Sequence, residues 1–369
     1  MTGKLQFKIE EFSEIEALAR IWRALEAHSN ASFYQSWDWI GTWIAAAQIR
    51  PHVLIGSLDS RTVLLAIIVP TVRREIPFLP VYGLHLQETG DRRKDVITIE
   101  FNGFLIDRSC AGEVECAAIG FLLSGITIEG RRRDELHIRG VLQRYEALKA
   151  PDVLCTTTKR KPSWRVDLSE IRASGKNYLD HLSANTRYQI RRSIRRYELA
   201  GSLTAVRARD VGEGLEFFDG LKGLHQAQWT RRGEPGAFAY PFFESFHRDL
   251  ISKALARGAV ELFRVGCPGR AIGYLYNFNY RGSTLAYASG FLFEDDEKLK
   301  PGLVSHCRCI EYHLQEGGLV YDFMAGDVRY KRNLGTAGPE MVHLLLQRPT
   351  VTLRMDYGLH AIKKAVWRN

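Results

Sequence analysis

The spacing of apolar positions predicts helices and strands throughout the first 160 residues. Apolar residues recur at helical spacing from about 13 to 27. Ser36 stands where it would cap a second helix, and Trp39 and Trp43 would share one face of that helix. The remaining elements are a helix over 113–123 and short strands, expected at 53–58, 62–72, 97–101, 136–138 and 153–155.

The second part of the chain shows a clearer order of elements. A polar and basic stretch at 156–164 is the predicted boundary between domains 1–160 and 161–369. The elements expected after it are helices at 175–200 and 214–229, a meander at 260–265, 271–280 and 284–291, a helix at 301–315, and strands at 319–324 and 341–347 that close the domain. This order predicts an α+β fold on a mainly antiparallel sheet. Because residues 136–140 take the place of 321–326 in a similar order, the sequence also suggests a duplicated unit.

Composition and charge exclude fewer classes of function than the order of predicted elements does. A chain of 369 residues with 45% hydrophobic and 25% charged residues is typical of a soluble globular protein. The longest apolar run, 63–69, is too short to span a bilayer, and six irregularly spaced cysteines favour a reduced, cytoplasmic protein. The net charge of +9 favours anionic partners, which include nucleotide phosphates, nucleic acid and anionic membranes.

The stretch from Tyr321 to Lys331 concentrates unusual chemistry. Asp322 lies on an apolar strand, where a carboxylate needs a partner. Asp327, Tyr330 and Lys331 follow within ten residues. Either Asp322 forms a structural pair with a lysine or an arginine that locks a turn, or this stretch is a corner of a substrate site.

Three other segments carry candidate chemistry, and each has a plain structural alternative. Five arginines on one helix (Arg187, Arg191, Arg192, Arg195 and Arg196) form either a phosphate- or RNA-binding face or a solvated surface. His225 and Trp229, one helical turn apart, form either a general base with its neighbour or a stacked pair at the edge of the core. The loop 297–302 offers lysines and a helix N-terminus to an anion, although many exposed loops carry two lysines.

A metal site is the less favoured interpretation of a fourth cluster. His306, Cys309 and His313 are expected on one flank of the helix 301–315, beside its buried face. They lack the paired loop spacing of structural zinc sites, so no metal is predicted.

The strand motif Tyr-Asp-Phe-x-x-Gly-Asp-x-x-Tyr-Lys, after a helix that starts at Pro301-Gly302, resembles the GNAT-like acetyltransferases of the cellulose-biosynthesis CelD type. These proteins are relatives of the FemABX aminoacyl ligases. The Phe33-to-Trp39 segment, the arginine-rich helix and the His225–Trp229 pair support the resemblance, which covers about residues 30 to 345. It implies two tandem GNAT-like domains, with the acyl donor between the last meander strand and the strand after the helix. The usual phosphate loop of that fold is replaced here by Glu-Lys-Leu-Lys-Pro-Gly.

The resemblance gives the candidate residues specific roles. The implied catalytic residues are His225 as base, with Asp322, Tyr330 and Lys331. Substrate contacts are expected from Trp229, Gly326, Asp327 and Arg329. The donor pyrophosphate is expected at Lys298, Lys300, Gly302 and Leu303. The implied activity is transfer of an acyl group from acyl-CoA to an amine or hydroxyl of a small molecule or saccharide, in polysaccharide or cell-envelope biosynthesis. The alternatives are an aminoacyl-tRNA-dependent ligase, for which nucleic acid would be a partner, and a non-catalytic GNAT-like binding module.

Overall fold

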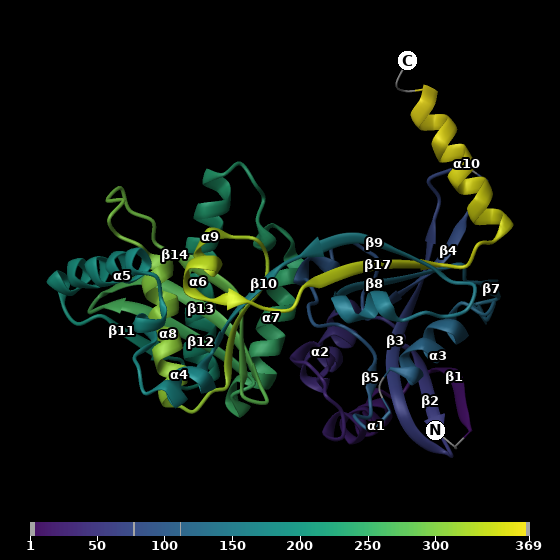
Figure 1. Ribbon diagram of the computed structural model, residues 1–369, viewed down its shortest axis with the longest axis horizontal. Coiled ribbons are helices and arrows are strands. Elements are labelled where there is room, and N and C mark those ends of the chain that lie inside the picture. Colours follow the sequence, from purple (N-terminus) through teal and green to yellow (C-terminus); the bar gives the residue numbers. More distant parts are fainter. Residues whose placement is uncertain (1–3, 77, 111, 367–369) are drawn as a thin grey trace. The chain divides into compact units, whose positions relative to one another are not determined.

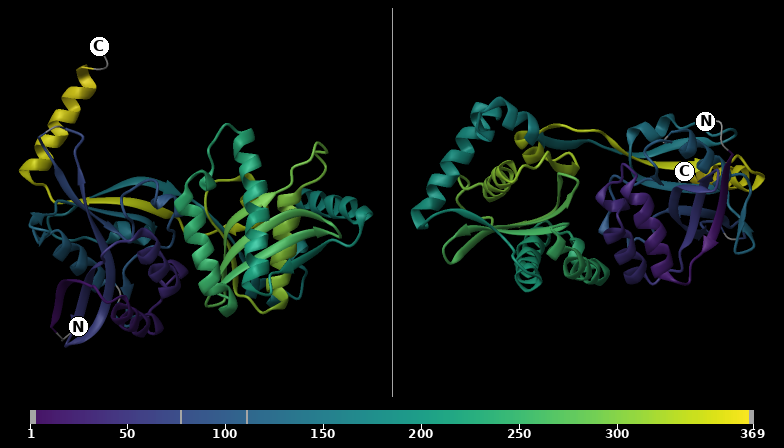
Figure 2. Two further views of the ribbon diagram at one scale, coloured as in Figure 1. Left: turned by 180° about the vertical axis from the view of Figure 1, so that it is seen from behind. Right: turned by 90° about the horizontal axis from the view of Figure 1, so that it is seen from below.

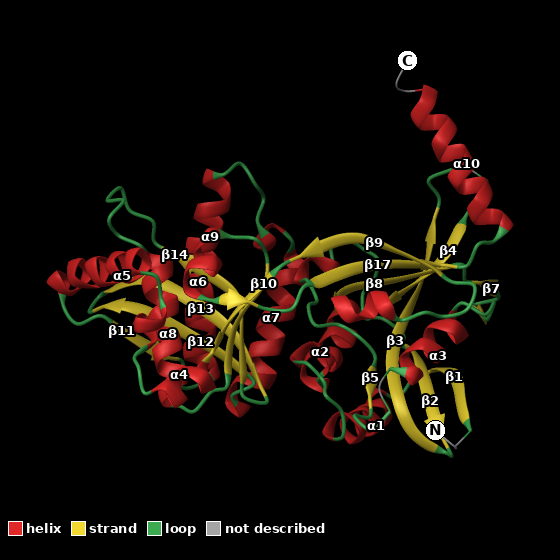
Figure 3. Ribbon diagram, viewed as in Figure 1, coloured by secondary structure: helices red, strands yellow, loops and turns green. Residues whose placement is uncertain are grey.

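The computed structural model describes residues 4–76, 78–110 and 112–366. The chain divides into a first unit, residues 1–160 and 341–369, and a second unit, residues 161–340. Figure 1 shows the path of the chain, and Figure 3 shows that both units combine helices and strands. The α+β class predicted from the sequence is confirmed, with a mixed sheet flanked by helices in each unit.

The first unit is built on a sheet in the order β1-β2-β3-β4-β8-β17-β9. Its elements are β1 (Leu5–Glu11), α1 (Ile15–Ala27), α2 (Trp37–Ala47), β2 (His52–Leu58), β3 (Arg61–Arg73), β4 (Val81–Leu86), β5 (Leu105–Ile106), α3 (Glu113–Leu122), β6 (Thr127–Ile128), β7 (Arg131–Arg132), β8 (Glu135–Leu142), β9 (Leu154–Lys161), β17 (Met341–Gln347) and α10 (Val351–Val366). Ser36 caps α2 as predicted, since its hydroxyl accepts the N–H of Trp39.

The second unit is built on a sheet in the order β11-β12-β13-β14-β15-β10-β16. Its elements are β10 (Ser163–Asp167), α4 (Leu168–Ser174), α5 (Ala184–Tyr197), β11 (Thr204–Arg207), α6 (Val211–Arg231), α7 (Pro241–Ala254), β12 (Val260–Cys267), β13 (Arg270–Tyr280), β14 (Ser283–Phe291), α8 (Pro301–Gln315), β15 (Val320–Ala325), α9 (Arg329–Leu334) and β16 (Thr336–Ala337). Helices cover both faces of this sheet, with α6 and α8 on opposite sides (Figure 2).

The two sheets share one topology, which confirms the suggested duplication. In each, four antiparallel strands are followed by a helix and a fifth strand that runs parallel to the fourth: β8 beside β4, and β15 beside β14. A sixth strand then pairs antiparallel with the fifth, and in neither sheet is it the next strand along the chain. In the first sheet it is β17, which follows the second unit, and in the second sheet it is β10, which follows the first.

Three sequence-based predictions about local structure are wrong. Residues 97–101 do not form a strand, because Thr98 and Phe101 adopt positive φ angles of 38° and 50°. The stretch 156–164, predicted as the domain boundary, is a separate case: it lies mostly in β9 and β10, and the division between the two units falls within it. The arginine-rich helix begins at Ala184, because Gly175 ends α4 in the left-handed region. Finally, 341–347 pairs with β8 of the first sheet and does not close the second domain.

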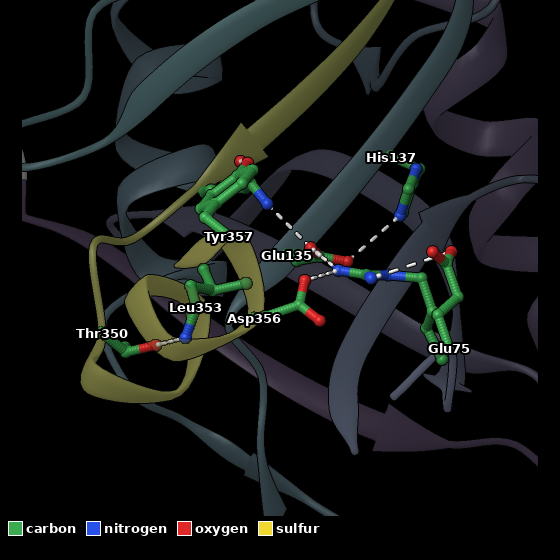
Figure 4. A network of polar contacts seen from close by, with 9 residues as sticks. Glu75, Glu135, His137, Thr350, Leu353, Asp356 and Tyr357 are labelled. Atoms are coloured by element: carbon green, nitrogen blue, oxygen red, sulfur yellow. Dashed lines mark hydrogen bonds and ion pairs between the residues drawn. The ribbon is translucent and has the colours of Figure 1, made fainter. Parts of the chain in front are cut away.

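A buried polar network holds α10 against the first sheet (Figure 4). The guanidinium of Arg73 lies 2.9 Å from both Glu135 and Asp356, two carboxylates that are only 2% exposed. Gln347 donates to Glu135 at 2.7 Å, and Tyr357 donates to Gln347. Burial alone lowers the pKa of Arg73, but its bonds to Asp356 and Glu135 raise that pKa above the ordinary value.

Candidate active site

The most distinctive feature of the second sheet is the divergence of β14 and β15. Their parallel ladder consists of three pairs and ends at Leu285–Asp322. Beyond that point β14 continues to Phe291 against β13, and β15 continues to Ala325 against β10. The two strands therefore separate at their C-terminal ends, and we call the opening between them the splay. Strand edges that separate in this way can take an extended ligand as an added strand.

Aromatic side chains line the splay on the α8 side. Phe291 comes from β14, Phe323 from β15 and Tyr330 from α9, and the imidazole of His306 on α8 contacts all three. The His306 ring stacks on Tyr330 with a centroid separation of 5.3 Å and an interplanar angle of 11°. His306 therefore bridges the ends of the diverging strands.

His306 carries an unsatisfied polar atom. Its side chain is 2% exposed, and Nδ1 lies 2.9 Å from the hydroxyl of Tyr321. Among the described residues, Nε2 is buried and has no hydrogen-bond partner. Desolvation, reinforced by the charge of Lys331, lowers the pKa of His306 to about 3, so the imidazole is neutral. A neutral buried imidazole with one unused nitrogen needs a water or a ligand atom.

The α6 side of the splay is formed by a close contact of helix and strand. A Cβ atom on Gly290 of β14 would lie 2.5 Å from the carbonyl oxygen of Leu221 and 3.1 Å from the main-chain nitrogen of His225. Only glycine permits this approach. His225, the base predicted from the sequence, therefore lies next to the end of β14.

The His225 ring is held in a defined tautomer. Its Nε2 accepts a hydrogen bond of 2.8 Å from Nε1–H of Trp229, so the proton of the neutral ring is on Nδ1. Within the described structure Nδ1 is buried without a partner, and burial lowers the pKa of His225. In this geometry His225 can donate from Nδ1, and it can accept a proton at Nε2 only after Trp229 moves away.

The predicted acid and lysine both bind the main chain at the end of β15. The Asp322 carboxylate accepts the N–H of Met324 at 2.6 Å, and Lys331 Nζ donates to the carbonyl oxygens of Ala325 and Met324 at 2.8 and 3.3 Å. Met324 has a φ of 63°, a strained conformation for a residue that is not glycine. Asp322 and Lys331 therefore fix the bent strand end beside the splay, and both side chains are buried.

The other predicted site residues differ in exposure. Asp327 is exposed and forms an ion pair with Arg332, and Arg329 is also exposed. Tyr330 is mostly buried against His306, and burial raises its pKa to about 12. Gly326 has a φ of 134°, and a Cβ there would lie 3.3 Å from Lys331 Nζ.

The α8 N-terminus holds the residues predicted to meet a pyrophosphate. Lys298 is exposed, and the main-chain N–H of Lys300 is already bonded to Ser193 Oγ at 2.9 Å. Gly302 lies against the Phe291 ring, and the Leu303 side chain is in the hydrophobic core, so these two could contribute only main-chain groups.

The arginines of α5 are only partly committed to ion pairs. Arg187 and Arg191 lie 3.7 and 3.8 Å from Asp180, and Arg196 lies 2.6 Å from Asp296. Arg192 stacks on the ring of Tyr188, and Arg195 is exposed. This face keeps its positive character on one side of the second unit.

The three donors that suggested a metal have separate partners. His306 bonds to Tyr321, Cys309 Sγ accepts from Asn277 at 3.4 Å, and His313 lies 3.3 Å from both Thr284 and Glu261. Across the described ranges, no group of three or more His, Cys, Asp and Glu residues is placed to hold a metal ion.

His306, Phe291 and Gly290 were missed by sequence reasoning as site residues. The helix that carries His306 was located, but its donors were weighed only as metal ligands. The position of His306 was a usable signal. It lies near the start of the helix that follows the last meander strand, and the start of that helix lies near the splay. Gly290 gave no signal, because its role depends on α6, about 65 residues earlier.

Comparison with known proteins places the second unit in a structural class. Residues 184–332 match a family model described as an acetyltransferase (GNAT) domain. None of the curated protein sequences compared matches this chain.

Solved structures resemble the whole chain at low sequence identity. The FemX structure is 14% identical and has a TM-score of 0.57, with 91% of this chain and 96% of that chain covered. L-PGS from Bacillus licheniformis is 10% identical with a TM-score of 0.54, and the coverage is 95% and 97%. The C-terminal domain of a putative lysylphosphatidylglycerol synthetase from Agrobacterium fabrum is 10% identical with a TM-score of 0.51, and 96% of each chain is covered. At these identities the comparison shows a shared fold.

Proposed function

Since the second unit carries a GNAT-type acetyltransferase domain, we propose that it transfers an acyl group from acyl-CoA to an amine or hydroxyl acceptor. The splay between β14 and β15 is the observation that carries this proposal. It lies within the matched residues, and unsatisfied imidazole nitrogens flank it on both faces of the sheet. No helix of the described residues is long and apolar enough to cross a membrane. We place the protein in the cytoplasm, where acyl-CoA is available.

The donor is proposed to lie in the splay as an extended arm. Its amide groups would bond to the edges of β14 and β15, as an added strand does. The thioester carbon would then lie near Gly290 on one side and near His306 on the other. The ends of the strands are held by Asp322 and Lys331, which we assign as positioning residues because they bind main-chain atoms of Met324 and Ala325.

The transfer step needs a proton acceptor and a site for negative charge. The acceptor nitrogen or oxygen attacks the thioester carbon, the C–S bond breaks, and the proton of the acceptor finally reaches the departing thiolate. His225 is the proposed proton carrier, and it becomes competent when an acceptor displaces Trp229 from Nε2. Main-chain N–H groups at the diverging strand edges would stabilise the oxyanion.

Calorimetry and thiol release with acetyl-CoA test this proposal directly. The wild-type protein should bind acetyl-CoA and release CoA in the presence of amine acceptors. His225→Gln should lower kcat by 10²- to 10⁴-fold, the usual contribution of a general base, while binding is retained. His181→Gln, at an exposed histidine of the same unit, is the matched control. The proposal fails if acetyl-CoA neither binds nor raises the melting temperature, which is the result expected of a non-catalytic GNAT-like module.

An aminoacyl-tRNA-dependent ligase is the second candidate. The arginine face of α5 and the shared fold with FemX favour it. Filter binding of charged tRNA at low salt separates the two activities, because phosphate contacts are strongest there. Absence of binding under those conditions rejects the ligase.

The finer assignments follow the CelD resemblance of the motif from Tyr321 to Lys331. We propose an acceptor in polysaccharide or cell-envelope biosynthesis, bound near Trp229, Gly326, Asp327 and Arg329. Screening saccharide amines and hydroxyls against small amines as acceptors tests this assignment.

A further inference from the structure

Exposed hydrophobic side chains gather in two segments of the first unit. Half of the large hydrophobic side chains that are exposed in the described residues lie either in the hairpin formed by β3 and β4 or in α10. We call this group the apolar patch, and its members are Val72, Phe78, Val351, Met355, Tyr357 and Leu359. Single exposed hydrophobic residues are normal on a protein surface, whereas a group of them marks a surface that binds a partner.

An ion pair holds the two segments of the apolar patch side by side. Arg73, near the end of β3, donates to the carboxylate of Asp356 on α10 at 2.9 Å (Figure 4). On α10, Val351, Met355 and Leu359 recur at every fourth position, so they share one face of the helix, and the buried Asp356 lies on another. The helix therefore binds the first sheet through one face and exposes apolar side chains on a different one.

The connection between β3 and β4 carries the most exposed side chain of the patch. Phe78 is fully exposed, and its φ of 69° is a strained conformation for a residue that is not glycine. A side chain this exposed adds nothing to the core, so packing within the unit does not account for a phenylalanine here. Exposed phenylalanine and leucine side chains next to basic residues are typical of segments that insert into the surface of a bilayer.

Exposed arginines surround the apolar patch. Arg74 follows β3, and Arg354 lies on α10. Arg131 is also exposed, and its guanidinium lies 5.5 Å from the centre of the Tyr82 ring, on the β4 residue that pairs with Val72. The hairpin and the helix therefore both present positive charge beside their apolar side chains.

The acids near the patch already have arginine partners. Asp356 is buried against Arg73, and the exposed Glu75 and Glu129 lie 3.7 and 3.4 Å from Arg73 and Arg133. Among the residues that the structure describes, the three exposed arginines around the patch form no ion pair. The face is therefore apolar with a positive border, which complements an anionic lipid surface.

We infer that the first unit docks on an anionic membrane surface through the apolar patch. Phe78 and the exposed face of α10 would enter the layer between headgroups and acyl chains, and the surrounding arginines would contact lipid phosphates. A second copy of the chain is a poorer occupant, because a two-fold interface would place these arginines against each other. The inference does not rest on the acyl transfer proposed for the second unit.

Flotation of the whole chain with lipid vesicles tests this inference. The wild-type protein should bind vesicles made of equal parts of phosphatidylglycerol and phosphatidylcholine, and it should bind phosphatidylcholine vesicles more weakly. Binding to the mixed vesicles should fall as salt is added, because salt screens the contacts between arginines and phosphates.

Substitutions within the patch locate the contact. Phe78→Ser should weaken binding to the mixed vesicles about tenfold, because the ring would otherwise leave water on insertion. Met355→Ser should also weaken it, and Arg354→Gln should weaken it about fivefold and reduce its salt dependence. All three side chains are exposed, so the melting temperature should stay at the wild-type value. The matched controls are Leu199→Ser, at an 89% exposed leucine of the second unit, and Arg20→Gln, at an exposed position of α1.

The inference is overturned if the wild-type protein does not bind the mixed vesicles at low salt, or if the patch variants bind them as the wild type does. Binding that is weakened only by Arg191→Gln would assign the contact to the arginines of α5 instead. Sedimentation velocity tests the other occupant: a dimer that Phe78→Ser dissociates, without vesicle binding, would assign the patch to a second copy. Thiol release from acetyl-CoA in solution should be the same in the patch variants and the wild type, so a failure of the proposed function is seen separately.

Discussion

Replacement of His306 by glutamine should change how the stability of the second unit depends on pH. His306 has a pKa of about 3 in the folded protein and about 6.5 in the unfolded chain. Below pH 6.5 the His306 imidazole therefore binds a proton in the unfolded chain but not in the folded protein, and the free energy of unfolding falls as the pH falls. The loss grows until the pH reaches about 3.

The magnitude follows from the interval between the two pKa values. A pH of 5.0 is about 1.5 units below the pKa of the imidazole in the unfolded chain, and each unit corresponds to about 1.4 kcal/mol of unfolding free energy. The wild-type protein should therefore lose about 2 kcal/mol between pH 7.5 and 5.0 through His306 alone. His85 and His313, with pKa values lowered to about 3 and about 4 mainly by burial, add losses that are common to wild type and variant.

Urea unfolding at pH 7.5 and pH 5.0 measures the effect. His306→Gln should lose about 2 kcal/mol less than the wild type over this interval, whatever its stability at pH 7.5. His181→Gln, at an exposed ring, should follow the wild type. Equal losses in His306→Gln and in the wild type would refute the neutral, buried imidazole and the site built around it.

Three further substitutions test other parts of the structure. Gly290→Ala places a methyl group 2.5 Å from the Leu221 carbonyl oxygen, so α6 must shift. Acceptor turnover, measured by thiol release, should fall at least tenfold. An unchanged rate would contradict the close contact between α6 and β14. Arg73→Ala leaves two buried carboxylates without their cation and should cost about 3–5 kcal/mol in urea unfolding, whereas the neighbouring Arg74→Ala should cost less than 0.5 kcal/mol. Trp229→Phe frees His225 Nε2, so the acidic limb of the pH–rate profile should shift to higher pH; an unshifted limb would show that the indole N–H does not control this nitrogen.

Local signals predicted the second sheet well. Pro301 fixes the start of α8 because proline fits the first helical turn, and Gly317 follows its end. The three meander strands were located because tight turns separate them. The acid on β15 directed attention to this strand end, although its bond to the Met324 N–H could not be predicted from the sequence.

The missed features depend on contacts between distant segments. β17 has the pattern of any buried strand, and nothing in its residues says which sheet it joins. Likewise, the sequence predicted Trp229 beside His225. Only the structure shows that the indole N–H donates a hydrogen bond to His225 Nε2, the nitrogen that a general base would use. The splay is defined by the residues at which β14 and β15 stop pairing, and the spacing of apolar residues does not indicate where that happens.

The late position of β17 in the chain has a consequence for biosynthesis. The second unit is a continuous segment, 161–340, and has all its strands as soon as that segment has left the ribosome. The first unit begins earlier but must wait for Met341–Gln347, because β17 lies between β8 and β9 in its sheet. Until then the edge of β8 is open, so the half of the chain that is made first is the last to close.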